Sequence, residues 1–212
     1  MCAKNSKDKN NFYLKYGKRL FDFIFSLLGI SFLSPFFFIL AILLKLDSKG
    51  PVFFLQKRIS KDLKEFNLIK FRTMIPNAQK LGPSITSIED PRITKIGKIL
   101  RKWKIDEFPQ LINVLKGDIS IVGPRPEIKK YVYYYLKDYE KILKIKPGIT
   151  DYAALKFRNE EKYLKKYENV EKIYLNEVLP MKIAFYKKYI EEIGFITDLK
   201  IIFATLGKIF SF

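Results

Sequence analysis

The chain contains no histidine and a single cysteine, Cys2. Without histidine there is no Ser-His-Asp or Cys-His nucleophile activation, no HExxH zinc site and no imidazole acid–base chemistry. One cysteine excludes an internal disulfide framework and a thiolate zinc site, and leaves the redox compartment open. An enzyme built from this sequence therefore takes its nucleophile and bases mainly from carboxylates, lysines or tyrosines.

Acidic residues are also scarce. Lys and Arg number 40 against 22 Asp and Glu, a formal net charge of +18 over 212 residues. Such an excess favours a polyanionic partner, and nucleic acid, an anionic membrane face and a phosphate-rich substrate all remain open on charge alone. The length suits one domain with a proper core.

One apolar run stands out near the N-terminus. Residues 23–44 carry no charge and are enough to span a bilayer as a helix. Ser34-Pro35 lies in the middle of this run, where proline removes a backbone donor and kinks a helix. Lysines and arginines flank the run on both sides, and positive flanks prefer the cytoplasmic side. A re-entrant helix-break-helix satisfies both flanks, and an ordinary tilted transmembrane anchor is the alternative.

These features divide the chain into three parts. Residues 1–19 form a basic N-terminal segment, 20–46 the re-entrant membrane helix, and 47–212 a domain at the cytoplasmic face, with interfacial helices, that would hold any catalytic site. The expected fold class is α+β and mainly helical, with a small β-hairpin and amphipathic interface helices around a compact domain.

The hairpin is predicted just after the membrane segment. Residues 52–57 and 65–72 read as two short strands joined by a polar turn. The pairing should place four basic side chains close together, although a solvated basic face is the commoner outcome. These are Lys57, Arg58, Lys70 and Arg72.

Further helices follow. A loop capable of covering a site is expected at 76–92, then a basic helix at 93–104. Tyrosines at helical spacing over 131–142 fit either an interfacial helix or an ordinary core face. Pro180 should open a helix that ends near Gly194, and Asp198 should cap a last amphipathic surface helix. A charged helical stretch is expected over 159–177.

The stretch from Arg101 to Glu127 has the highest density of chemically suggestive residues. It places the acidic pair Asp106-Glu107 between a basic segment and Arg125, which is held by two prolines. Asp106 is predicted to be a helix N-cap, where the helix dipole also stabilises anions. A rigid Arg125 suits two-pronged contact with phosphate. A capped helix followed by a tight turn, with no chemistry, is the alternative.

The ordered set of motifs resembles the bacterial sugar transferase family, the small monotopic phosphoglycosyl transferases. The likeness covers roughly residues 17–210. The matching segments are KRLFDFIFS with Ser34-Pro35, QKR at 56–58, KFRTM at 70–74, DPRITKIGKILRK at 90–102, DEFPQLINVLKGDISIVGPRPE at 106–127, KPGIT at 146–150 and DLKIIF at 198–203.

The resemblance implies a reaction. Asp106 matches the family's nucleophile, which attacks the diphosphate of a UDP-sugar, releases UMP and forms a phosphosugar-aspartyl intermediate. Polyprenyl (undecaprenyl) phosphate then accepts the phosphosugar, the first membrane step of glycan assembly. Glu107, with Asp106, would hold the required Mg²⁺. Carboxylate attack on phosphorus needs no histidine.

The resemblance also suggests partners and place. Candidate phosphate contacts are Lys70, Arg72, Arg101, Arg125 and Arg158. The protein is expected to be monotopic on the cytoplasmic face of the bacterial inner membrane, with an anionic membrane but no nucleic acid as partner. A homodimer stays open.

Some positions depart from the family pattern. Many members continue PGITG with a WAQVNGRN-like string, whereas this chain reads PGITDYAALKFRNE. Tyr186 stands where many members have aspartate, and Ser60 where glycine is usual. Tyr152, Lys156 and Arg158 are candidate neighbours of the sugar. None of the departures touches the acidic pair, so they affect the expected specificity rather than the reaction class.

Two other function classes compete. A non-catalytic, membrane-anchored scaffold would use its charge to bind anionic lipid or a partner enzyme, and would tolerate Asp106→Asn. A nucleic-acid binder is suggested only by net charge, and its basic residues are spread along the chain without a recognised motif.

Overall fold

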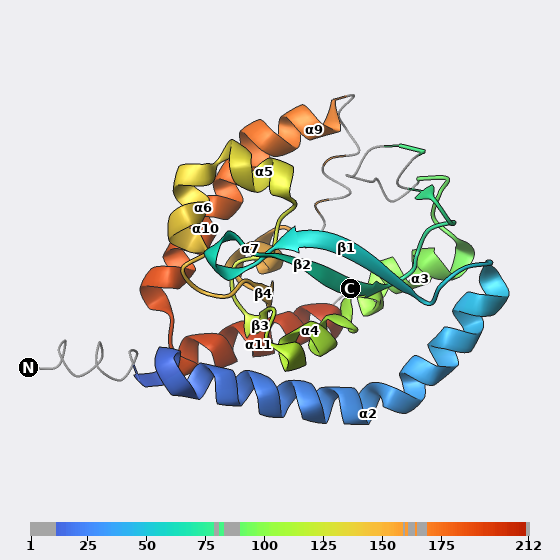
Figure 1. Ribbon diagram of the computed structural model, residues 1–212, viewed down its shortest axis with the longest axis horizontal. Helices are drawn as coiled ribbons and strands as arrows, with labels where there is room; N and C mark the ends of the chain where they lie inside the picture. The colour runs from blue at the N-terminus through green and yellow to red at the C-terminus, as the bar shows by residue number, and fades with distance from the viewer. Residues whose placement is uncertain are drawn as a thin grey trace, which may run out of the picture.

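A computed structural model describes residues 12–78, 81–82, 90–158, 160, 164 and 169–210. The described chain is mainly helical with two small sheets, which confirms the expected fold class at that level (Figure 1). Cys2, most of the basic N-terminal segment, much of the loop expected at 76–92 and most of 159–168 lie outside the described residues.

The apolar run forms α2, Lys18–Asp47, which follows the π-helical turn η1, Tyr13–Gly17. Together they make the one helix among the described residues that is long and apolar enough to cross a membrane. The predicted break is a bend, because the helix continues through Pro35 and curves in its second half (Figure 1). Proline cannot donate to the carbonyl of Ser31, four residues back, and the Ser34 hydroxyl donates to that oxygen instead, at 2.9 Å.

Both ends of α2 are attached to the rest of the chain. Near its start, the Arg19 guanidinium donates to the carbonyl oxygens of Val114 and Leu115, at 2.6 and 2.8 Å. Near its end, Leu44 is fully buried and its carbonyl accepts a hydrogen bond from Arg72 at 3.0 Å. The helix therefore runs along one side of the molecule and returns to it at each end (Figure 1).

The predicted hairpin is confirmed as β1, Phe53–Ile59, paired antiparallel with β2, Glu65–Phe71, around the 3₁₀ turn η2, Lys61–Leu63. The prediction that its four basic residues lie together is wrong. Alternation along β1 points Lys57 to solvent and Arg58 inward, toward Glu127. Only Lys70 reaches the acidic pair, as described below.

The centre of the chain forms short elements. These are α3, Lys95–Trp103, the 3₁₀ turn η4, Ile105–Glu107, and α4, Gln110–Lys116, followed by β3, Ser120–Val122, parallel to β4, Gly148–Thr150. The two short strands approach so closely that a Cβ on Gly148 would lie 2.2 Å from the backbone nitrogen of Gly123. Glycine at both positions is what lets the loop after β3 pack against β4.

The remaining helices enclose the main core. They are α5, Lys129–Tyr134, α6, Leu136–Ile142, α7, Tyr152–Lys156, α9, Val170–Ile173, the π-helical η5, Tyr174–Val178, and α10, Leu179–Glu192. The helix expected near Pro180 is present as α10, but helical conformation already runs from Val170 through η5, so Pro180 lies within the helix and does not open it. Tyr131 and Tyr139 are buried in this core, so the tyrosine row takes the core alternative rather than the membrane interface, although Tyr134 is exposed.

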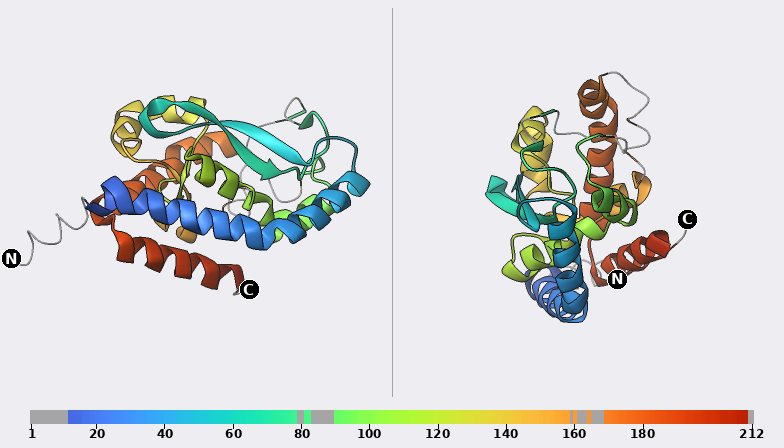
Figure 2. Two further views of the ribbon diagram at one scale, coloured as in Figure 1. Left: turned by 60° about the horizontal axis from the view of Figure 1, so that its bottom comes forward. Right: turned by 90° about the vertical axis from the view of Figure 1, so that its right-hand side faces the viewer.

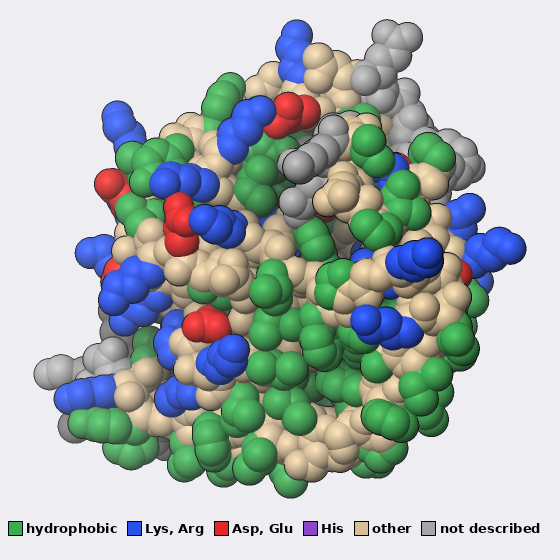
Figure 3. All heavy atoms as spheres, turned by 45° about the vertical axis from the view of Figure 1, so that its right-hand side comes forward, with side chains coloured by type: hydrophobic (Ala, Val, Ile, Leu, Met, Phe, Trp, Pro, Cys, Tyr) green, Lys and Arg blue, Asp and Glu red, His purple; other side chains and the backbone are tan. Residues whose placement is uncertain are grey.

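The last helix, α11, Phe195–Phe210, runs beside the start of α2, where Phe195 and Phe21 meet edge to face (Figure 2). Its exposed face carries Phe203 and Leu206, as an amphipathic surface helix should. Hydrophobic side chains form a band along the lower edge of the molecule where α2 lies, with lysines and arginines above it (Figure 3). The two helices thus present an apolar surface.

The prediction that Asp198 caps this helix is wrong. α11 begins three residues earlier, and Asp198 is fully buried in its first turn. Its carboxylate accepts hydrogen bonds from Tyr13 and Tyr189, both at 2.7 Å, and from Lys18 at 2.5 Å. Asp198 therefore joins the first turns of α2 and α11 rather than capping the backbone N–H groups at the start of a helix.

Candidate active site

The acidic pair lies at a sharp turn between α3 and α4. Lys104 has φ +58°, a left-handed conformation that costs a non-glycine residue energy and reverses the chain after α3. Asp106 and Glu107 follow in η4, and α4 does not begin until Gln110. The predicted N-cap role of Asp106 is wrong, because its side chain makes no capping hydrogen bond and Pro109 occupies that position.

Glu107 is held between two cations. Lys70, from β2, donates to Oε1 at 3.0 Å, and Arg125 binds both carboxylate oxygens, with Nη1 lying 3.0 Å from Oε2 and Nη2 in contact with Oε1. Burial opposes ionisation of Glu107, but Arg125 and Lys70 outweigh it, so the pKa of Glu107 lies well below its usual value. Burial lowers the pKa of Lys70, while Glu107 acts in the opposite direction. Glu107 is therefore a fixed anion bonded on both oxygens.

Asp106 is in the opposite condition. Its side chain is buried, with 7% of the residue exposed, and Oδ1 has no hydrogen-bond partner among the described residues. Burial and the neighbouring charge of Glu107 raise the pKa of Asp106 to about 6. A buried carboxylate without donors is costly in a purely structural role, and perturbed groups of this kind cluster at functional sites.

Two further carboxylates support the loop that carries Arg125. Asp151 accepts the backbone N–H of Arg125 at 3.1 Å and that of Ala154 at 2.6 Å. Burial raises the pKa of Asp151 to about 6. Glu127 binds Arg58 at 3.0 Å, which ties the same loop to the hairpin that carries Lys70. The two cations around Glu107 are thereby held by connected elements.

Not all of the predicted phosphate-binding residues meet at the pair. Arg72 donates to the carbonyl oxygens that end α2, among them Ser48 at 2.7 Å and Lys49 at 3.0 Å. The Nε of Arg101 donates to the hydroxyl of Thr73 at 2.9 Å. Arg158 is half-buried and forms no hydrogen bond or ion pair with either carboxylate. The structure brings together Asp106, Glu107, Lys70 and Arg125, and Arg101 lies close enough for its charge to act toward a lower pKa of Asp106.

The carboxylates fit a magnesium ion in one respect. Mg²⁺ is commonly bound by one or two carboxylates with substrate phosphates and water completing its shell. The unpartnered Oδ1 of Asp106 suits such a ligand, whereas Glu107 would have to release Lys70 or Arg125 to contribute. Groups of three or more potential metal-binding side chains do not occur among the described residues.

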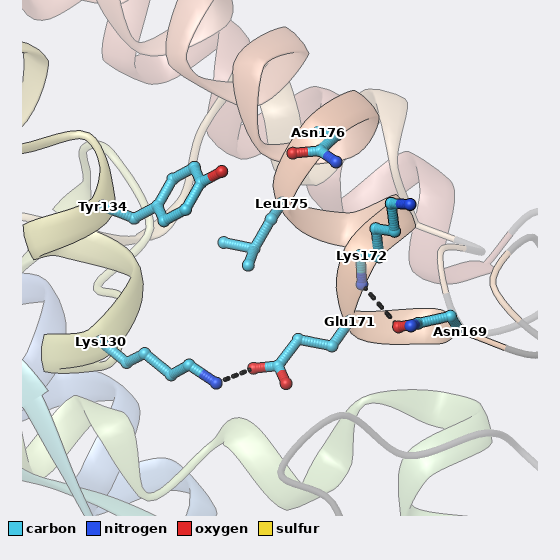
Figure 4. A pocket seen from close by; sticks show the side chains of 7 residues that line it. All are labelled: Lys130, Tyr134, Asn169, Glu171, Lys172, Leu175 and Asn176. Atoms are coloured by element: carbon cyan, nitrogen blue, oxygen red, sulfur yellow. Dashed lines mark hydrogen bonds and ion pairs between the residues drawn. The ribbon is translucent and has the colours of Figure 1, made fainter.

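A surface hollow lies elsewhere, between α5 and the α9–η5 segment (Figure 4). Its one carboxylate, Glu171, is bound by Lys130 at 2.7 Å and by the Tyr131 hydroxyl at 3.2 Å. None of its lining residues belongs to the site around Asp106.

Comparison with known protein families matches residues 13–212 to the family described as bacterial sugar transferase. The match covers α2, the acidic pair and α11. The chain belongs to the bacterial sugar transferase family.

Individual relatives agree with this membership. One relative is the UDP-N-acetylgalactosamine-undecaprenyl-phosphate N-acetylgalactosaminephosphotransferase of Aeromonas hydrophila. The two sequences are 40% identical over 143 residues, which cover 65% of this chain and 33% of that protein. The undecaprenyl-phosphate glucose phosphotransferase of Komagataeibacter xylinus is 35% identical, covering 90% of this chain and 35% of that protein. The chain thus spans about a third of each of these two relatives. The exopolysaccharide production protein ExoY of Sinorhizobium fredii is 30% identical, covering 91% and 84%.

Sequence reasoning identified the pair and its two cations but missed residues that support them. Asp151 carried a usable signal, since it directly precedes the short helix α7 and caps it. Glu127 carried no local signal, because its partner Arg58 lies in a distant strand.

Proposed function

We propose that this chain transfers a phosphosugar from a UDP-sugar to polyprenyl phosphate, with Asp106 as the nucleophile. The observation that carries the proposal is the contrast within the acidic pair. Asp106 is buried with an unpartnered oxygen, beside a Glu107 whose charge is offset by Lys70 and Arg125. The names of two relatives support the same substrates. One names a UDP-sugar and undecaprenyl phosphate, and the other names undecaprenyl phosphate and glucose.

In the first step, a carboxylate oxygen of Asp106 attacks the sugar-bearing phosphorus of the UDP-sugar. An oxygen–phosphorus bond forms to Asp106 and the phosphoanhydride bond to the other phosphorus breaks, so UMP leaves with the electron pair. Arg125 and Lys70 bind Glu107, the neighbour of Asp106, and so lie close to the phosphorus that Asp106 attacks. Their positive charges offset the anionic charge that develops there. In the second step, a phosphate oxygen of polyprenyl phosphate attacks the same phosphorus and expels the Asp106 carboxylate.

Mg²⁺, when bound, would screen the diphosphate charge and ease the approach of an anionic nucleophile. Asp106, with Glu107, would hold it. Burial of the pair excludes water, which limits hydrolysis of the aspartyl phosphate before the acceptor arrives.

We further infer that α2 enters and leaves one leaflet and that the chain is monotopic on the cytoplasmic face. A straight helix of 30 residues would be about 45 Å long and would separate its ends across a bilayer. Arg19 at one end and Leu44 at the other contact the same body of the protein, which supports return to one side. The basic surface above the apolar band suits anionic lipid (Figure 3).

Turnover tests the reaction. Detergent-solubilised protein is incubated with Mg²⁺, polyprenyl phosphate and each of a panel of UDP-sugars, and UMP release is measured. We expect release with at least one sugar, its loss in Asp106→Asn, and no loss in Asp62→Asn, a matched change at an exposed turn. Folded protein that releases no UMP with any donor, or an active Asp106→Asn, would contradict the proposal and favour a scaffold.

Labelling tests the topology. In a Cys2→Ser background, Lys15→Cys and Lys49→Cys place single thiols near the two ends of the α2 region. We expect a membrane-impermeant reagent to label both from the cytoplasmic side only. Labelling from opposite sides would show a spanning anchor.

A further inference from the structure

A row of buried polar side chains follows the acidic pair along α4. Gln110 and Asn113, three residues apart in α4, share one face of that helix, and Asp106 lies four residues before Gln110 in the 3₁₀ turn η4, which leads into α4 through two residues in helical conformation. Gln110 and Asn113 are each 1% exposed. The backbone of β2, the strand that carries Lys70, lies against this face, since Asn113 bonds it directly.

The two carboxamides on this face differ sharply. The Oδ1 of Asn113 accepts the N–H of Ile69 at 2.9 Å, and its Nδ2 donates to the carbonyl of Asn67 at 2.8 Å and to Asp118 at 2.9 Å. The Nε2 of Gln110 is enclosed and has no acceptor among the described residues. The same functional group at the same burial is fully bonded in one residue and unbonded in the other.

Asp106 has the hydrogen-bond acceptor that the Gln110 side chain lacks. Oδ1 of Asp106 is an enclosed acceptor without a donor, and Nε2 of Gln110 is an enclosed donor without an acceptor. Side chains in a helix lean toward its N-terminus, so we expect the side chain of Gln110 to point toward the turn that contains Asp106. A pair of unmatched buried groups one turn apart is unusual, because nearly all buried polar groups are hydrogen-bonded.

We infer that Gln110 is a positioning residue for Asp106: with the donor substrate bound, Nε2 of Gln110 donates a hydrogen bond to Oδ1 of Asp106 and leaves Oδ2 to attack phosphorus. This role rests on the proposed function. A carboxylate on a single bond can rotate and present either oxygen, and holding one of them sets the line of approach to the phosphorus atom. An acceptor oxygen has a second lone pair, so Oδ1 can accept this bond and still face a metal ion.

A purely structural Gln110 would behave differently from a positioning one. If Gln110 only fills space, its loss reduces the fraction of competent protein and leaves each intact molecule as fast as before. If Gln110 orients Asp106, the loss slows formation of the intermediate in every molecule. Asn113, which is saturated with structural hydrogen bonds, provides the matched comparison on the same face.

The test uses full-length protein in lipid nanodiscs with an accepted UDP-sugar and no acceptor lipid. Rapid quench gives the rate constant, the amplitude of phosphosugar-protein adduct and the donor concentration for half-saturation. In Gln110→Met, which keeps length but removes the donor, we expect the rate constant to fall by about 10–100-fold with amplitude and half-saturation unchanged. Asn113→Leu should lower amplitude and melting temperature but not the rate constant, and the exposed Lys116→Gln should change none of these.

The outcomes separate two failures. A wild-type adduct together with an unchanged rate constant in Gln110→Met, or a loss confined to amplitude, overturns the role of Gln110 and leaves the proposed function intact. Wild-type protein that forms no adduct overturns the nucleophilic role of Asp106, and the role of Gln110 falls with it.

Discussion

Two buried aspartates, Asp106 beside α4 and Asp198 in α11, differ in what surrounds them. Asp198 is 0% exposed and accepts hydrogen bonds from a lysine and two tyrosines. Asp106 is 7% exposed and leaves an enclosed oxygen without any donor. Both carboxylates lose their contact with water, but hydrogen bonds within the described chain offset this desolvation cost only for Asp198.

The difference separates a structural charge from a chemical one. Saturation by three donors fixes Asp198 and joins α2 and α11 at their first turns. An unsaturated buried carboxylate destabilises the fold and is retained where a substrate needs it. Substitutions at the two positions should therefore have opposite effects on stability and activity.

The largest effect on stability is expected at Asp198. Asp198→Asn leaves the buried Lys18 ammonium without its carboxylate, and breaking such a pair costs about 3–5 kcal/mol. Unfolding in detergent should show a correspondingly lower melting temperature. Asp106→Asn is the control and should melt at the wild-type temperature or above, since it removes a buried charge that has no donor. Equal destabilisation by both substitutions would remove the distinction.

Glu107 sharpens the comparison from within the site. Glu107→Gln removes the anion between Lys70 and Arg125, leaving two neighbouring cations unpaired and misplaced. We expect UMP release to slow by about 10²–10³-fold, with the protein still folded. A variant that keeps wild-type turnover would show that Lys70 and Arg125 do not depend on Glu107 for their positions. Lys129→Gln, which loses an exposed ion pair with Glu65 and a cation–π contact with Tyr133 away from the acidic pair, is the control.

Asp151 is a third buried carboxylate, and pH dependence tests it. Its pKa in the folded protein, about 6, exceeds its ordinary value of 3.8, so the folded state binds the proton more tightly. Its contribution to stability is thus fully present below about pH 3.8 and is lost as the pH rises to about 6. The melting temperature of wild type minus that of Asp151→Asn should fall across this window and then level. A constant or rising difference would contradict the raised pKa.

The smallest effect is expected at the bend of α2. Ser34→Ala removes the hydroxyl that donates to the Ser31 carbonyl, at a cost of about 1 kcal/mol. The Ser31→Ala control retains that carbonyl and should be nearly neutral. Melting in nanodiscs measures both variants. Equal effects would show that the carbonyl is satisfied in another way.

Local patterns predicted the parts of the fold whose partners are near in sequence. The hairpin strands and the helix over 179–192 follow from alternation and helical spacing. The acidic pair and Arg125 were found because they occur close together in one dense motif. Functional residues that lie close together in the chain can therefore be predicted from the sequence.

Long-range partners were not predictable from such patterns. Asp198 read as a cap because nothing near it reveals Tyr13 and Lys18, which lie 185 and 180 residues earlier. Arg72 read as a phosphate contact, although its guanidinium closes the end of α2, where it bonds Leu44 and Ser48. In each case the sequence identifies a charged side chain, but its hydrogen-bond partners are set by the packing of elements that are distant in the chain.

Peptide mapping of the protein after incubation with an accepted UDP-sugar, without acceptor lipid, tests the central claim most directly. We predict a phosphosugar mass on the peptide that contains Asp106, at one per molecule, and its absence in Asp106→Asn. Turnover that requires polyprenyl phosphate and never leaves a modified peptide would contradict the claim, and would show direct transfer between the two substrates.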